Sequence, residues 1–186
     1  MDLGRISPVA GIASSAVFLI LWIAAAVADQ SWELGRFSLS HLGICGNDFS
    51  EICFNLGCAL SGILGIVFGM GVTEQKGAFR VCGIAVLCCG TLITCVGIIN
   101  LHYGDAHRSV AALYGLAATI CMVSSAYGDW RSGERKLALF TSAMLLACAA
   151  VMFTQRFEVF EPFAVCCVLT WTVSQSVKYL RSPFSA

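Results

Sequence analysis

Six long stretches of this chain contain no charged residue, and this distribution constrains the fold more than any other feature. A helix rises about 1.5 Å per residue, so about 20 residues cross the roughly 30 Å hydrocarbon core of a bilayer. Charged residues make up 12% of the chain, about half of the ~25% typical of a soluble domain. A water-soluble fold is therefore excluded. The charge-free stretches are residues 8–28, 52–72, 81–101, 109–127, 137–153 and 162–177.

These stretches predict transmembrane helices. They lack the alternation of barrel strands, and a lone segment in lipid satisfies its own backbone hydrogen bonds only as a helix. The first stretch also resembles a secretory signal because Arg5 precedes it and small residues occupy 26–28, but it is longer than the ~7–15 apolar residues of such a signal. We predict an all-α integral membrane protein, a single six-helix bundle over residues 1–186. The predicted helices are residues 8–28, 52–72, 81–101, 109–127, 137–153 and 160–180.

The basic residues favour one orientation in the membrane. The two ends of the chain and residues 73–80 and 128–136 hold eight of the 11 Lys and Arg residues, whereas residues 29–51, 102–108 and 154–161 hold three. Because basic residues concentrate in cytoplasmic loops, we predict that both termini are cytoplasmic and that the protein lies in the plasma membrane. The formal net charge is zero, so there is no excess of positive charge to bind nucleic acid.

Residues 29–51 form the one long segment between predicted helices, on the predicted outer side. Three glycines and several Ser, Asn and Asp residues in this segment favour turns over a long helix. Loops of this length in a compact domain are more often functional than accidental. We therefore expect a site at this segment and at the neighbouring helix ends.

Two short motifs resemble a known membrane family. Residues 38–43 (SLSHLG) precede residues 54–57 (FNLG), and residues 96–98 (VGI) end the third predicted helix before His107 opens the fourth. With the helix count and loop lengths, this pattern resembles the membrane family catalogued as domain of unknown function 998 and, more distantly, the Frag, DRAM and Sfk-type six-helix proteins. That family commonly has Asp or Glu after the serine of its S-x-L-G motif, where this chain has His41. The distant relatives are linked to lipid organisation and membrane trafficking, so the resemblance implies a related function.

The leading functional hypothesis is an outward-facing polar pocket that binds or organises membrane lipid, or contacts another membrane protein. The guanidinium groups of Arg36, Arg108 and Arg156 suit a lipid phosphate. Asn55 has a second interpretation as a structural amide that bonds back to the outer segment, because an amide in lipid needs partners. The residues predicted to bind the ligand are Ser38, Ser40, His41, Asn55, His107 and Arg108.

A second hypothesis is a metal-dependent membrane hydrolase that acts on lipid headgroups. All three histidines lie in outward segments beside acidic residues, and imidazole and carboxylate are usual zinc ligands. However, His102 and His107 are not the i, i+4 pair that places two ligands on one helix face, and Asp105 has an alternative role as a helix N-cap. The candidate ligands are His41, His102, His107 and Asp105, with Asp48 or Asp105 as base.

Other features bear on mechanism and partners. No Asp, Glu, Lys, Arg or His lies in the middle of a predicted helix, which disfavours ion conduction and proton-coupled transport. A facilitative small-solute channel lined by Ser and Thr is a third hypothesis. Cys45 and Cys53 flank the turn-rich segment and are candidates for a disulfide on an oxidising side. Ser61, Gly65 and Gly69 recur every four residues, as at a close helix contact within the bundle or in a homo-oligomer.

Overall fold

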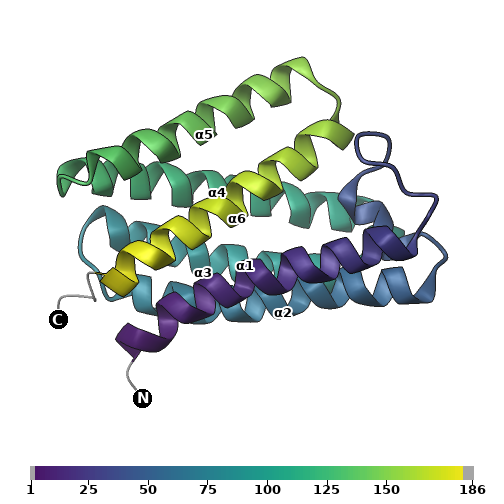
Figure 1. Ribbon diagram of the computed structural model, residues 1–186, viewed down its shortest axis with the longest axis horizontal. Coiled ribbons are helices and arrows are strands. Elements are labelled where there is room, and N and C mark those ends of the chain that lie inside the picture. The colour runs from purple at the N-terminus through teal and green to yellow at the C-terminus, as the bar shows by residue number, and fades with distance from the viewer. Residues whose placement is uncertain (1–2, 182–186) are drawn as a thin grey trace.

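The computed structural model describes residues 3–181, which contain six long α-helices, two short 3₁₀ helices and no β-strand (Figure 1). All six α-helices are long and apolar enough to cross a membrane. The prediction of an all-α chain with six candidate spans is therefore confirmed. In chain order the elements are α1 (Leu3–Ala28), η1 (Leu39–Ile44), α2 (Asp48–Thr73), α3 (Ala78–Ile98), η2 (Leu101–Tyr103), α4 (Asp105–Arg131), α5 (Arg135–Thr154) and α6 (Phe157–Arg181).

The six helices form a ring around a common axis. Each helix packs against the next one in the chain, and α6 packs against α1 (Figure 1). Short connections make successive helices antiparallel, so the start of α1 and the end of α6 lie at the same end of the bundle. We name this the terminal end. The opposite end, which holds residues 29–47 and η2, is named the loop end.

The close packing of α2 on α3 depends on glycine. A Cβ atom on Gly90 would lie 2.7 Å from the Gly62 carbonyl oxygen, closer than real Cβ atoms approach other atoms. A Cβ on Gly65 would meet Gly90 at 3.7 Å. A Cβ on Gly69 would meet the backbone nitrogen of Leu87 at 3.0 Å. The glycines of the small-residue stripe on α2 thus contact α3 of the same chain.

Several helices extend beyond the charge-free stretches because polar residues form their end turns. Asn47 caps α2: its side-chain oxygen accepts a hydrogen bond from the Ser50 amide at 3.1 Å, and the helix begins four residues before the predicted residue 52. α4 runs four residues further at each end than the predicted 109–127. In contrast, α3 ends at Ile98, short of the predicted residue 101, because the chain turns through η2 and Gly104 adopts φ +54°.

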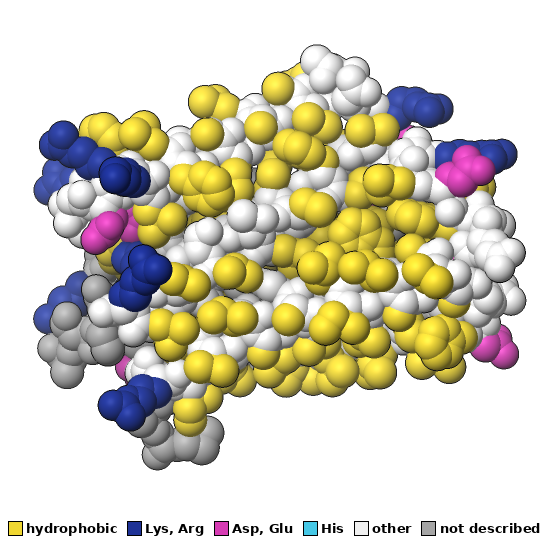
Figure 2. Space-filling view, viewed as in Figure 1, with side chains coloured by type: hydrophobic (Ala, Val, Ile, Leu, Met, Phe, Trp, Pro, Cys, Tyr) yellow, Lys and Arg dark blue, Asp and Glu magenta, His cyan; other side chains and the backbone are white. Residues whose placement is uncertain are grey.

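The surface has the side-chain distribution of a multi-pass membrane protein. Figure 2 shows hydrophobic side chains across the middle of the visible face and charged side chains toward the two ends of the bundle. In this view, Lys and Arg side chains gather mainly at the terminal end. Large apolar side chains are widely exposed, among them Ile20, Ile63 and Leu146, which are 64%, 52% and 72% exposed. Helices that are hydrophobic on their outward faces as well as their inward ones are typical of membrane spans.

Candidate functional site

A carboxylate of α6 holds the loop end together. One oxygen of Glu161 accepts a hydrogen bond from the Leu39 backbone amide at 2.7 Å, and the other accepts one from the Ser40 hydroxyl at 3.1 Å. Leu39 is the first residue of η1, so Glu161 satisfies an amide that the 3₁₀ helix leaves unpaired, at the end where negative charge is stabilising. The contact joins segments that lie 122 residues apart in the chain.

The loop is also attached to α1 and α2. The Asn47 side-chain amide donates to the Ala28 carbonyl at 3.0 Å, and the Asn55 side-chain amide donates to the Gly43 carbonyl at 3.1 Å. Leu42 of η1 is fully buried beneath the loop. Asn55 therefore makes the structural contact that was one of its two predicted roles, and it attaches the loop to α2.

Asp29 stabilises the turn that leaves α1. Its Oδ1 atom accepts hydrogen bonds from the Ser31 hydroxyl at 2.6 Å and from the Ser31 backbone amide at 3.0 Å. The hydroxyl hydrogen bond, supported by the amide, holds the pKa of Asp29 below its ordinary value because both bonds favour the charged carboxylate. The ionised side chain thus fixes the direction in which the chain enters the loop.

The loop end contains a cavity of about 850 Å³ between residues 36–41, α4 and the start of α6. We name it the loop cavity. Its volume falls within the ~300–1,000 Å³ of small-molecule sites. Five of the six residues predicted to bind a ligand line it, and the exception is Asn55. The polar lining residues are Arg36, Ser38, Ser40, His41, His107, Arg108, Thr119, Glu158 and Glu161.

The two histidines of the loop cavity are held in place differently. His107 is buried, and its Nδ1 atom lies 2.7 Å from the Ile99 carbonyl oxygen. A carbonyl only accepts hydrogen bonds, so Nδ1 carries the proton and Nε2 is the remaining ring nitrogen. This bond fastens the start of α4 to the residue that follows α3. The ring of His41 stacks on Phe37 with 4.8 Å between ring centroids.

The two arginines of the loop cavity are exposed, and each forms one exposed ion pair. Arg36 pairs with Glu33 at 3.3 Å, and Arg108 pairs with Asp105 at 3.1 Å. Exposed ion pairs of this kind contribute about 0–1 kcal/mol, so both guanidinium groups can exchange these partners for another anion. Asp105 is the first helical residue of α4 and not its N-cap, a position that Gly104 occupies.

The four predicted metal ligands do not converge. His41 and His107 line the loop cavity, but His102 is exposed in η2 and does not line it. Asp105 is engaged with Arg108. Within residues 3–181, no group of three or more His, Cys, Asp or Glu side chains is placed to hold a metal ion. These residues therefore do not fit the zinc centre that the hydrolase hypothesis requires.

A second cavity continues from the loop cavity along the bundle axis. This middle hollow has a volume of about 180 Å³ and is lined by residues of all six α-helices and η1, most of them apolar. It shares Ser40, Gly115 and Glu161 with the loop cavity. The polar groups are thus concentrated at the loop end, and the lining becomes apolar toward the centre of the bundle.

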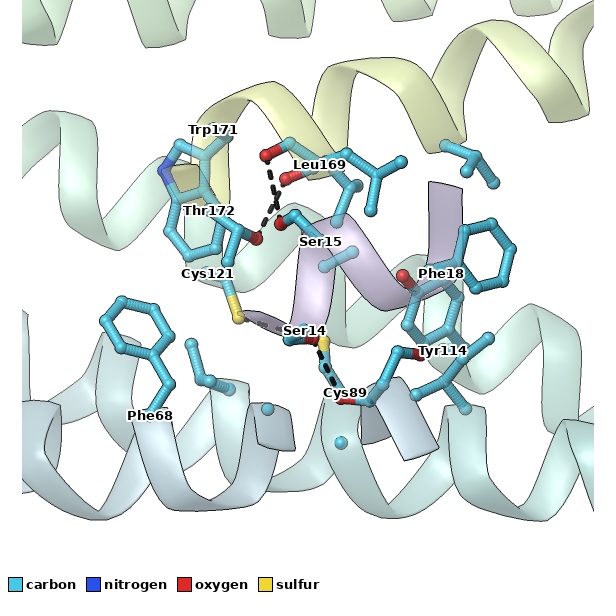
Figure 3. Close-up of a pocket in the computed structure, with 18 residues that line it drawn as sticks. Ser14, Ser15, Phe18, Phe68, Cys89, Tyr114, Cys121, Leu169, Trp171 and Thr172 are labelled. Carbon is cyan, nitrogen blue, oxygen red and sulfur yellow. Dashed lines mark hydrogen bonds between the residues drawn. The ribbon is translucent and has the colours of Figure 1, made fainter. Parts of the chain in front are cut away.

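A third cavity, the inner hollow, lies deeper and has a volume of about 80 Å³. It shares Phe18 and Tyr114 with the middle hollow. Figure 3 shows these two side chains on one side of the inner hollow and Phe68 and Trp171 on the other. The Ser14 hydroxyl, also in its lining, donates to a backbone carbonyl of α2 at 2.8 Å. The three cavities therefore follow one another along the axis of the ring.

A buried ion pair joins α4 and α6 at the terminal end. Asp129 has a fully buried side chain whose oxygens accept hydrogen bonds from Lys178 Nζ at 2.6 Å and from Gln175 Nε2 at 2.8 Å. The Trp171 indole donates to the Ser125 hydroxyl at 2.9 Å. None of these residues was among the predicted site residues. The spacing of Trp171, Gln175 and Lys178 along one face of α6 is the sequence signal that points to them.

The cysteines form no disulfide in the described part of the chain. Cys45 and Cys53, the predicted candidates, are both free thiols. The Cys45 sulfur lies 3.5 Å from the Leu42 carbonyl oxygen, and Cys53 is buried on α2. The loop is thus held by hydrogen bonds and by burial of η1.

These features define a class of protein: a multi-pass helical membrane protein whose polar cavity at one end continues into apolar hollows on the bundle axis. The chain belongs to the family described as Protein of unknown function (DUF998), which matches residues 12–177. The family resemblance seen in the loop and helix motifs is thereby confirmed. No curated protein and no solved structure matches the chain.

Proposed function

We propose that this protein lies in the plasma membrane with both termini in the cytoplasm and binds the phosphate headgroup of a membrane lipid in its outward-facing loop cavity. One observation carries the proposal. Side chains from the loop and from α4, which are far apart in the chain, line a single cavity of about 850 Å³ at the loop end. The polar end of an amphipathic ligand fits such a cavity.

The chemistry of the lining suits a phosphate. Arg36 of the loop and Arg108 of α4 both line the cavity, and guanidinium binds phosphate oxygens through paired, charge-assisted hydrogen bonds. The hydroxyl of Ser38 and the ring of His41 add neutral hydrogen-bonding groups. Glu158 also lines the cavity, so a headgroup that carries an amine beside its phosphate has a partner as well.

The apolar side of the loop cavity supports entry from the bilayer. Leu116, Met152 and Phe157 line the cavity and are 58%, 50% and 57% exposed. Exposed apolar side chains at a cavity mouth favour contact with acyl chains over contact with water. A lipid of the outer leaflet therefore reaches the arginines without leaving the membrane.

Binding of lipids with matched acyl chains tests the headgroup assignment. The purified protein is mixed with phosphatidylglycerol or with diacylglycerol, which lacks the phosphate, and bound lipid is counted by native mass spectrometry. We expect phosphatidylglycerol to bind at least about tenfold more tightly, a difference of roughly 1.4 kcal/mol. The double variant Arg36→Gln, Arg108→Gln should lose this preference. Equal binding of both lipids by the wild-type protein would refute the proposal.

A matched control separates a specific phosphate contact from a general effect of charge. Arg135 lies at the start of α5, at the terminal end, with its guanidinium 5.5 Å from the Trp130 ring centroid. It does not line the loop cavity. We expect Arg135→Gln to leave the phosphate preference unchanged. A loss as large as that of the double variant would show that the arginines act only through net charge.

The proposed orientation has an independent test. Gly46 and Gly133 lie in exposed turns at opposite ends of the bundle, and exposed turns are the sites where insertions are best tolerated, so an epitope is inserted at either position. An antibody should stain intact cells when the epitope is at Gly46, and only permeabilised cells when it is at Gly133. The reverse pattern would overturn the orientation.

A further inference from the structure

We infer that the middle and inner hollows hold one acyl chain of the lipid whose phosphate sits in the loop cavity. This inference rests on the proposed function of the loop cavity and names the ligand class more narrowly. The ligand is a phospholipid that places a single chain on the axis of the helix ring. Its second chain, where there is one, stays in the bilayer along the exposed mouth residues Leu116 and Met152.

The first argument is the order of the cavities. Ser40, Gly115 and Glu161 line both the loop cavity and the middle hollow. Phe18 and Tyr114 line both the middle and the inner hollow (Figure 3). The lining is most polar at the headgroup end and mostly apolar beyond it, where the hydroxyls of Ser14, Ser15 and Thr172 donate hydrogen bonds to backbone carbonyls. This change from a polar to an apolar lining follows the same order as the polar headgroup and apolar chain of a phospholipid.

The second argument is the chemistry of the middle hollow. Its lining combines residues of every α-helix, and the apolar ones include Phe54, Val96 and Val165. Apolar cavities of this size stay dry and take up apolar guests. A membrane supplies hydrocarbon chains in excess, and the loop cavity connects the middle hollow to the bilayer.

The third argument is Gly115, which lies within α4 where the loop cavity meets the middle hollow. Glycine within a helix is less favourable than alanine, so its presence normally reflects a close neighbour. A Cβ built on Gly115 meets no atom within 4 Å. Gly115 is exposed, and no group of the described chain requires the missing side chain. The open space at Gly115 lies where the acyl chain would pass between the two cavities.

The length of the path suits a chain from one leaflet. Arg108 lines the loop cavity and Cys121 lines the inner hollow. Both belong to α4, and at ~1.5 Å per residue they are about 20 Å apart along the helix. This distance is more than half of the roughly 30 Å hydrocarbon core. Beyond the inner hollow, the Trp171–Ser125 hydrogen bond at 2.9 Å closes the path.

Side chains of increasing size at Gly115 test the inference in the full-length protein. Gly115→Leu and Gly115→Phe place side chains at the junction of the two cavities, where a built Cβ meets no atom within 4 Å, so both should keep the wild-type melting temperature. We expect binding of phosphatidylglycerol to weaken by about tenfold or more, with the larger loss for Phe. Leu113→Phe places the same aromatic ring at an exposed position of α4 that lines none of the three cavities and should leave binding unchanged.

Photo-crosslinking locates the chain directly. The probe is a phosphatidylglycerol with a diazirine at the end of one acyl chain, in vesicles that contain the wild-type protein or a variant. We expect crosslinks at the inner-hollow residues Tyr114, Ala118 and Cys121, and expect Gly115→Phe to abolish them. Crosslinks confined to lipid-exposed residues such as Leu113, with headgroup preference intact, would overturn this inference and leave the proposed function standing. Loss of headgroup preference in the wild-type protein would overturn both.

Discussion

Removal of Lys178 should destabilise the bundle more than removal of its partner Asp129. The pair lies at the terminal end with 2.6 Å between Lys178 Nζ and Asp129 Oδ1. The two side chains differ in their access to solvent, because Asp129 is 0% exposed and Lys178 is 17% exposed. The Lys178 ammonium also lies 3.8 Å from the centroid of the Phe79 ring. Removal of either partner therefore leaves an unpaired charge, and the two charges differ in their burial.

The expected magnitudes follow from this asymmetry. Lys178→Met leaves a fully buried carboxylate with Gln175 as its remaining donor among the described residues, and unpairing a buried charge costs about 3–5 kcal/mol. Asp129→Asn leaves an ammonium that keeps its contact with Phe79 and can extend toward water, so we expect a loss of about 1–3 kcal/mol. The double variant leaves no buried charge and should be more stable than Lys178→Met alone.

Reversible unfolding in mixed micelles, followed by circular dichroism, measures these differences. Lys136→Met is the matched control because Lys136 is an exposed lysine at the same end, and its loss should lie within about 0.5 kcal/mol of zero. Equal losses for the two single variants, or additive losses in the double variant, would refute the assignment of a buried and coupled pair.

Three further predictions concern the loop end. Glu161→Gln replaces a charge-assisted hydrogen-bond acceptor with a neutral one, which should weaken the hydrogen bond to the Leu39 amide by about 1–2 kcal/mol. Hydrogen exchange at this amide should therefore accelerate about tenfold. An unchanged rate would show that Glu161 does not hold η1. His107→Phe leaves the Ile99 carbonyl without its donor and should cost about 1–3 kcal/mol in thermal unfolding; a loss near zero would contradict the bond. The pKa of Asp29 is lower in the folded protein, so the stabilisation by its carboxylate is complete above the ordinary value of 3.8 and is lost as pH falls through the lower folded value. Hydrogen exchange of the turn should therefore rise only below about pH 4. Asp29→Asn should remove this pH dependence.

The helices could be predicted because charged residues avoid the hydrocarbon core. Each charge-free stretch overlaps one observed helix, and the errors lie at the helix ends. Asp129 and Glu161 border two of the charge-free stretches, and both belong to helices. The predicted helix 160–180 already contained Glu161, whereas the predicted helix 109–127 left Asp129 out. Their charges are satisfied by donors from other elements. A rule that reads every charged residue as exposed to water fails where such a residue has partners inside the fold.

The loop cavity could be predicted in part. The polar side chains of Ser38, His41 and Arg108 pointed to the loop end, because polar groups excluded from the apolar stretches collect at the helix ends. Whether they converge depends on how the ring of helices closes, and the pairing of Glu161 with the Leu39 amide spans 122 residues. The axial hollows left no pattern in the sequence, because a residue that lines an apolar cavity has the same composition as one that fills the core.

The position of α6 in the ring has a consequence for biogenesis. Translation releases α6 after the other five helices, and its packing against α5 and α1 closes the ring. Before that step, Asp129 stands in the nascent protein without Gln175 or Lys178, a bare acidic group that a lipid environment tolerates poorly. A chain that stalls before α6 is made therefore keeps an unpaired acidic group on α4 that membrane quality control can recognise.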